Sequence, residues 1–252
     1  MKNKLKIFIS VLFCFFLLTK SINANEPFIF NVTEIEVLKN GNQINGYKGG
    51  TAISEDGSTI TAENFFYNKL TNILEATGNV KYIDESRNSI ITSDKAIYLK
   101  NEEKILTNGN SKAENENNII TAENLEYDKL NNFFKAKKNA VIEDFEKNSL
   151  IYADEITYLK NEEKVLTNGN SKAENENNII TAENLEYDKL NNFFKAKKNA
   201  VIEDFEKNSL IYADEITYLK NEEKVLTNGK TKALIEDKYT FYSENVSYLR
   251  EI

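Results

Sequence analysis

The chain has 252 residues, of which 40 are acidic and 32 are basic, and its formal net charge at pH 7 is -8. Because it is this acidic, we do not expect it to bind nucleic acid. It has no His, no Trp and one Cys, so it lacks the usual general base near neutral pH, the commonest metal ligand and any internal disulfide. The composition therefore predicts that the protein is not an enzyme and holds no metal or other cofactor.

The N-terminus predicts export. Three lysines among the first six residues precede an apolar run over residues 7–18, which contains the single cysteine, Cys14. This order is typical of a secretory signal peptide, and the run is short for a membrane span. We predict a signal peptide over residues 1–24, cleaved after Ala24, followed by a single domain over residues 25–252. An uncleaved membrane anchor is the alternative interpretation.

The remainder of the chain is a repeat. Residues 106–169 are identical, position by position, to residues 166–229, which indicates a recent tandem duplication. Inside the duplicated unit lies an older period of about thirty residues, marked by one tyrosine in each period. These tyrosines are Tyr67, Tyr98, Tyr127, Tyr158, Tyr187, Tyr218 and Tyr248. Units of such a repeat contact mainly their neighbours, so a unit can be copied without interrupting the fold.

Each period predicts two strands. Apolar and small residues alternate with period two before the tyrosine, and a second alternation stands seven and nine residues after it, which is typical of β-strands. The first alternation is broken at an acidic residue four positions before the tyrosine, where we predict a β-bulge with the acid pointing to solvent. A glycine eleven positions after the tyrosine, such as Gly109, predicts the next turn. Residues 122–130 (AENLEYDKL) also suit a helix, but the recurrent β-branched residues and turns argue against it.

A strand pair with one apolar face is not stable alone, so successive pairs are expected to stack and bury a continuous apolar strip. If the strand halves fold into a V, this strip becomes an apolar channel with open first and last edges. The pattern ITAENFFYNKLTNILEATGNV, residues 60–80, resembles the OstA-type domain of lipopolysaccharide-transport proteins. That family includes LptA, LptC and the periplasmic N-terminal domain of LptD, and the resemblance extends from about residue 28 to the end.

The resemblance implies an all-β fold of the open β-jellyroll or "β-taco" type, made of stacked antiparallel strand pairs, in the periplasm of a Gram-negative cell. Its groove would shield the acyl chains of lipopolysaccharide during outer-membrane assembly. We expect the groove to be lined by side chains at four repeated positions, with core packing as the alternative role for each. These residues are Ile60, Phe65, Tyr67, Leu74, Ile91, Tyr98, Ile105, Ile120, Leu125, Tyr127, Phe134, Ile151, Ile156, Tyr158, Val165, Ile180, Leu185, Tyr187, Phe194, Ile211, Ile216, Tyr218 and Val225.

The last unit, residues 238–252 (KYTFYSENVSYLREI), stops shortly after its tyrosine. A strand edge left there predicts edge-to-edge pairing with another transport domain or a second copy, or continuation in a longer protein. A free LptA-like bridge and a shortened LptD N-terminal domain both fit this pattern. A structural surface protein, such as a β-solenoid adhesin, is the alternative from another class, and its core would be closed and dry.

Overall fold

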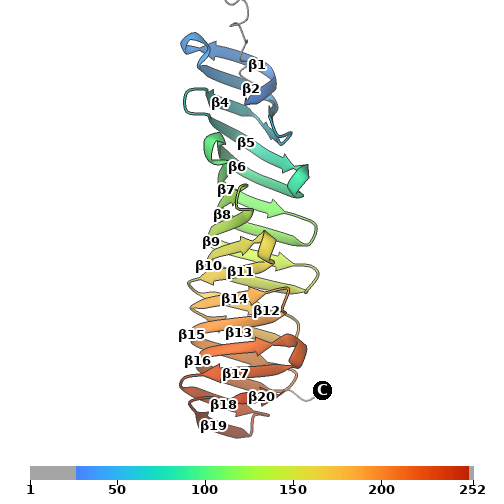
Figure 1. Cartoon of the computed structure of the whole chain (residues 1–252), viewed down its shortest axis with the longest axis vertical. Coiled ribbons are helices and arrows are strands. Elements are labelled where there is room, and N and C mark those ends of the chain that lie inside the picture. The colour runs from blue at the N-terminus through green and yellow to red at the C-terminus, as the bar shows by residue number, and fades with distance from the viewer. Residues whose placement is uncertain (1–26, 250–252) are drawn as a thin grey trace, which may run out of the picture.

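The computed structural model describes residues 27–249, which form a tall, twisted stack of β-strands (Figure 1). All the strands belong to one sheet. Every strand pairing is antiparallel. The predicted signal peptide, residues 1–24, lies outside the described residues.

Each crossing of the stack, which we call a rung, is one long strand or two short strands in line. The long strands are β1 (Phe28–Leu38), β2 (Gln43–Ser54), β5 (Ile73–Asp84), β6 (Ser89–Leu99), β7 (Lys104–Glu114), β8 (Asn118–Asp128), β9 (Phe133–Asp144), β10 (Ser149–Leu159), β15 (Phe193–Asp204) and β16 (Ser209–Leu219). The divided rungs are β3 (Thr59–Ala62) with β4 (Asn64–Asn68), β11 (Lys164–Asn168) with β12 (Ser171–Glu174), β13 (Asn178–Ala182) with β14 (Asn184–Asp188), β17 (Lys224–Asn228) with β18 (Thr231–Ile235), and β19 (Tyr239–Ser243) with β20 (Ser247–Leu249).

Short 3-10 turns connect some of the rungs, namely η1 (Lys39–Gly41), η2 (Glu85–Arg87), η3 (Lys100–Glu102), η4 (Lys160–Glu162) and η5 (Lys220–Glu222). Two consecutive rungs span about thirty residues, so the predicted all-β stack of antiparallel strand pairs is confirmed. The segment that also suited a helix, residues 122–130, lies in β8 and the turn after it. Its alternation of buried and exposed side chains outweighs its helix propensity, because burial against neighbouring rungs stabilises the strand.

Near its middle, each rung either shifts register or is divided, and on every second rung the predicted acid lies at this point. Between β5 and β6, for example, Gly78 and Asn79 lie opposite the single residue Asp94. Asp94 is exposed, as predicted. Two residues facing one define a β-bulge, which bends the strand and restores the alternation of buried side chains on both sides. We call this bend in each rung the corner.

The predicted glycine conformation is correct, but its predicted location is wrong. The four predicted glycines, Gly78, Gly109, Gly169 and Gly229, have φ between +78° and +83°. They lie at corners in the middle of rungs and not in turns between rungs, because the bulge itself needs a left-handed residue. The acid of the preceding rung also packs directly over the glycine. A Cβ on Gly169 would lie 2.4 Å from Asp154 Oδ2.

The corners divide the sheet lengthwise into two half-sheets that fold onto each other. The tyrosine half-sheet contains the recurrent tyrosines, and the isoleucine half-sheet contains the isoleucines seven positions before them. Their buried faces meet, since the ring centroid of Tyr82 in the isoleucine half-sheet lies 6.4 Å from those of Tyr98 and Tyr127 in the tyrosine half-sheet. A single apolar core therefore fills the space between the two half-sheets.

Candidate functional site

The candidate site is the space between the half-sheets, where the structure places all 23 predicted groove residues. Each of them is at most 3% exposed. The repeat brings them together into one continuous apolar surface, but their own side chains fill it. A cavity that reaches Ile180, Phe194 and Tyr218 has a volume of about 10 Å³. In this closed arrangement, the interior at that point has no room for another molecule.

Flat aromatic surfaces recur along this interior. Tyr127 stacks on Phe134 with ring centroids 4.4 Å apart and an interplanar angle of 14°. Tyr187 stacks in the same way on Phe194, at 4.1 Å and 4°. Both pairs are direct cross-strand neighbours, so the antiparallel register fixes them face to face. The repeat therefore places broad apolar faces at regular intervals along the stack.

Tyrosine hydroxyl groups bring polarity to the rim of the interior, next to the turns. Tyr98 donates a hydrogen bond to Glu103 Oε2 at 2.5 Å, and Tyr158 and Tyr218 make the same bond one or two units later. Burial raises the pKa of Tyr127 to about 12, so its ring remains neutral at physiological pH. Each tyrosine thus presents an apolar ring to the interior and a polar tip to the rim.

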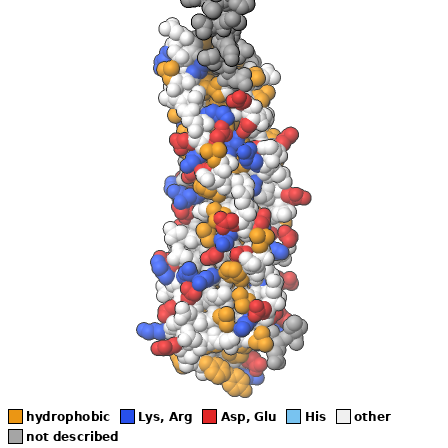
Figure 2. Space-filling view, viewed as in Figure 1, with side chains coloured by type: hydrophobic (Ala, Val, Ile, Leu, Met, Phe, Trp, Pro, Cys, Tyr) orange, Lys and Arg blue, Asp and Glu red, His pale blue; other side chains and the backbone are white. Residues whose placement is uncertain are grey.

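The apolar interior surface reaches both ends of the stack. Val37 of β1 pairs with Ile44, which pairs with the core residue Tyr67, so Val37 faces the interior although it is 58% exposed. At the other end, Phe241 of β19 pairs with the core residue Ala233 and is 54% exposed. Figure 2 shows hydrophobic side chains gathered at the lower end of the molecule, where β18 and β19 lie. Among the described residues, each end rung has a neighbour on one side only.

A row of basic residues is a second regular feature, which the apolar periodicity did not predict. A basic residue stands two positions after each recurrent tyrosine, and these residues are Lys69, Lys100, Lys129, Lys160, Lys189, Lys220 and Arg250. The lysines lie in the turns at the free edge of the tyrosine half-sheet. The side chains of Lys129 and Lys189 are only 1% and 4% exposed. Buried charges need partners of opposite charge or hydrogen-bond acceptors. The fixed spacing of these basic residues is therefore the sequence signal that could have predicted a row of polar contacts at the turns.

Other kinds of site find no support in the part of the chain that is described. Within residues 27–249, no group of three or more His, Cys, Asp or Glu side chains is arranged to hold a metal ion. Over the same range, no helix has the length and apolar character needed to cross a membrane.

Comparison with known proteins finds one family model that matches part of the chain. Residues 29–147 match the model of the OstA-like protein family. A search of curated proteins found no match. The crystal structure of LptH from Pseudomonas aeruginosa, described as the LptA homologous periplasmic component of the lipopolysaccharide transport device, aligns with 17% identity and a TM-score of 0.41. The alignment covers 45% of this chain and 85% of that chain.

The matched segment runs from β1 into the turn after β9, and residues 166–207 repeat residues 106–147 of it without a change. The chain therefore carries an OstA-like segment over residues 29–147, part of which the duplication repeats.

Proposed function

We propose that the protein is a non-enzymatic periplasmic component of lipopolysaccharide transport, which carries or bridges acyl chains between its half-sheets during outer-membrane assembly. The observation that carries this proposal is that one apolar surface runs through the whole stack and emerges at both ends, at Val37 and Phe241. A conduit needs such a surface, and an enzyme site does not. The match of residues 29–147 to the OstA-like family supports the same function.

The end rungs suit the proposed partners. Interior-facing side chains that are more than half exposed are unfavourable in an isolated molecule, and a further rung would cover them. We propose that β1 and the rung β19–β20 pair edge to edge with other transport-bridge domains or with a second copy. Pairing of this kind extends both the backbone ladder and the apolar surface.

Loading requires the half-sheets to separate, because the interior is filled by side chains. Exposing four large apolar side chains costs roughly 6–12 kcal/mol at about 1.5–3 kcal/mol each. An acyl chain of about twelve methylene groups recovers about 10 kcal/mol at about 0.8 kcal/mol per group. The two terms are of similar size, so the empty protein stays closed and an acyl chain offsets the cost of opening.

Photo-crosslinking at neighbouring positions tests this function. Ile120 is 3% exposed and faces the interior, whereas the next residue, Thr121, is exposed on the outer face. We expect Ile120→p-benzoylphenylalanine to form lipopolysaccharide adducts under ultraviolet light and Thr121→p-benzoylphenylalanine to form none. Phe134, also interior, serves as a second test position. Equal labelling at inner and outer positions, or none at either inner position, would falsify the proposal.

One observation favours the alternative of a structural surface protein. The interior residues are all nearly inaccessible, as in a closed and dry β-solenoid. In that case the same experiment gives no lipid adduct at Ile120 or Phe134, and the purified protein contains no lipopolysaccharide.

A further inference from the structure

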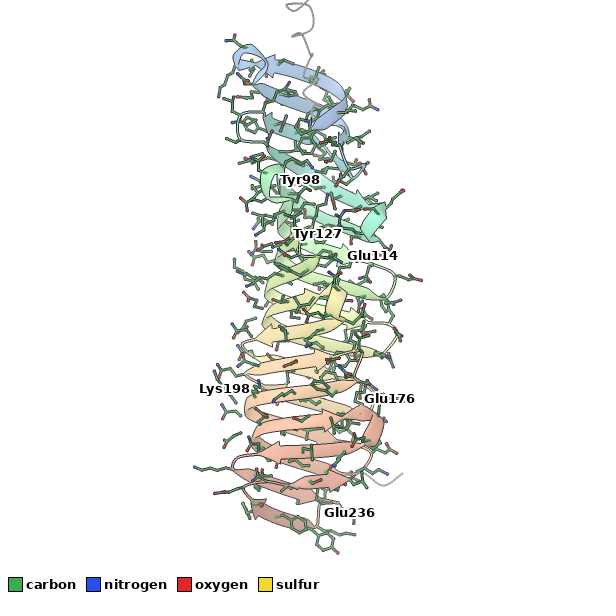
Figure 3. All side chains as sticks on the ribbon, viewed as in Figure 1. Tyr98, Glu114, Tyr127, Glu176, Lys198 and Glu236 are labelled. Carbon is green, nitrogen blue, oxygen red and sulfur yellow. The ribbon has the colours of Figure 1, made fainter. Side chains whose placement is uncertain are left out.

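The two long sides of the folded sheet are held together by different forces. On one side lie the corners, where the backbone of every rung passes continuously from one half-sheet to the other. On the opposite side, the turns of the tyrosine half-sheet meet the turns and strand ends of the isoleucine half-sheet, along a line that we call the seam. Figure 3 shows Lys198 at a corner and Glu176 in an isoleucine-side turn projecting from opposite sides of the stack. All strand pairings of the described residues join consecutive rungs, so side chains alone tie the seam.

The first tie is made by Lys129, in the turn after β8. Its Nζ donates to Asp56 Oδ2, in the turn after β2, and lies 3.8 Å from Asp84 Oδ2 at the end of β5. On its own side of the seam it contacts Tyr98 OH at 3.0 Å and Glu103 Oε2 at 3.3 Å. This lysine therefore links the two half-sheets through its buried ammonium group, which has carboxylates on both sides of the seam.

The tie recurs at the next lysines. Lys160 Nζ donates across the seam to Arg87 O and Ser89 Oγ, both at 2.8 Å. Lys189 Nζ lies 3.0 Å from Asp144 Oδ2 and 3.3 Å from Asn118 Oδ1. Most of these partners are 71 to 73 residues apart in sequence, which is more than two repeat periods.

The duplicated sequence supplies an untied counterpart of the same site. Lys220 is the copy of Lys160 and lies 5.8 Å from the ring centre of Phe194, as Lys160 lies 5.6 Å from that of Phe134. The serine that corresponds to the partner of Lys160 is Ser149, and its buried Oγ has no hydrogen-bond partner. A cavity of about 480 Å³, lined by Lys220, Lys147 and Asn178 among others, opens here. Among the described residues, Lys160 is thus hydrogen-bonded across the seam, whereas its copy Lys220 is not.

Apolar side chains line both lips of the seam. Leu130 and Leu190 follow directly after Lys129 and Lys189 and are 69% and 71% exposed. On the facing lip, Phe145 and Phe205 follow directly after Asp144 and Asp204 and are 50% and 49% exposed. Exposed apolar residues in regular rows beside a buried apolar interior favour contact with hydrocarbon chains.

We infer that the seam is a hinged mouth latched by lysines, through which the acyl chains of an anionic amphiphile pass sideways into the interior. The inference rests on the proposed lipid-carrying function. The half-sheets separate at the seam and bend at the corners, because opening the seam breaks a few side-chain contacts and leaves the backbone ladder intact. Each freed lysine is then hydrated or meets an anionic group of the amphiphile, so no buried charge is left unpaired.

Distance measurements between spin labels test this inference. In the full chain with Cys14→Ser, labels at Phe145→Cys and Leu190→Cys lie on opposite lips of the seam. Labels at Leu130→Cys and Leu190→Cys lie on one lip, where the backbone ladder fixes their separation, and serve as the matched control. On adding lipopolysaccharide, we expect the distance across the seam to increase by several ångströms and the distance along the lip to stay unchanged.

The possible results separate the two proposals. Lipopolysaccharide that binds without changing the distance across the seam overturns the hinged mouth and leaves the transport function standing. A protein that binds no lipopolysaccharide overturns both. A reversible lock gives an independent measurement: Ser89→Cys and Lys160→Cys, bridged by a reducible bifunctional thiol reagent, should slow lipopolysaccharide uptake at least tenfold, and reduction should restore it. Uptake at the original rate in the bridged protein would also overturn the mouth.

Discussion

At the scale of single residues, the corner acid and the residue it faces on the next rung are matched in size. Asp154 lies over Gly169, and its Oδ2 accepts a hydrogen bond from Asn170 Nδ2 at 2.8 Å. Glu123, which is longer, pairs with Lys138 Nζ at 3.0 Å, and that lysine adopts φ +64° in the glycine's place. The acids are exposed, as the sequence predicted, but each of these also bonds to the neighbouring rung. The corner acid, which lies opposite the bulged residues, therefore holds the bend as well as interacting with solvent.

Replacing the corner glycine tests this match. Gly57, in the turn after β2, serves as the control, because it has φ +86° and no atom lies within 4 Å of a Cβ added there. We expect Gly57→Ala to lose about 1–2 kcal/mol of unfolding free energy from backbone conformation alone. Gly169→Ala should lose about 1 kcal/mol more, because Asp154 must turn away and give up the hydrogen bond from Asn170. Urea unfolding followed by circular dichroism measures both. Equal losses would show that the acid does not require a glycine beneath it.

At the scale of elements, the turns of both half-sheets form the ionic ties of the seam. Burial alone would raise the pKa of Asp56, but hydrogen bonds from Lys129 and Ser58 hold that pKa well below its usual value. The pKa values of Asp84 and Glu103 are also lowered, against the effect of burial, by their own hydrogen bonds and the nearby Lys129. Turns that would otherwise be independent are thus coupled through one buried ammonium group.

Acid should weaken this coupling. A carboxyl with a lowered pKa in the folded state stabilises the fold fully above its unfolded pKa, and this contribution is lost as the pH falls from about 4 through the lowered value. We expect the unfolding free energy to fall between pH 5 and about pH 2, and to fall less in Lys129→Met. The exposed Lys81→Met serves as the control for loss of charge and should behave like the original protein. An identical acid dependence in Lys129→Met would contradict the coupling.

At the scale of the whole molecule, the stack is a linear array in which rungs contact mainly their neighbours. The duplicated copies follow the same order of rungs, although β8 is continuous and its copy is divided into β13 and β14. β9 and β15 span the same twelve sequence letters and share one burial pattern. Length can therefore vary in units of four rungs while the pairing of neighbouring rungs is kept.

Removing one copy tests this modularity. Deletion of residues 110–169 joins Gly109 to Asn170 and leaves a seamless repeat. We expect a folded protein that is shorter by roughly 20 Å, from four rungs at about 4.8 Å each, as measured by small-angle X-ray scattering. Deletion of residues 110–154 removes three rungs and reverses the strand direction at the junction, so it should not fold. A shortened chain that fails to fold would contradict the modular array.

The sequence alone determined the rungs, the bend at each acid and the inward side of every strand, although it placed the extra residue at the acid and the structure places it on the rung opposite. These follow from local alternation and from contacts between rungs that are adjacent in the chain, and both are visible in a periodic sequence. It also indicated the left-handed glycines, although it placed Gly109 in a turn between rungs. The apolar interior was predictable for the same reason, since residues such as Ile120 and Phe134 occupy fixed positions in each period.

Only the tertiary structure decided that the interior is closed and how its open side is tied. The partners Lys129 and Asp56, or Lys160 and Ser89, are brought together by the accumulated twist and tilt of several rungs. Small rotations summed over a stack leave no local pattern in the sequence. Lys160 and Lys220 illustrate this, because their own turns are identical while the lips that face them differ, with Arg87 opposite the first and Lys147 opposite the second. The state of the seam therefore depends on which rungs the fold brings opposite each lysine, and the lysine's own turn does not decide it.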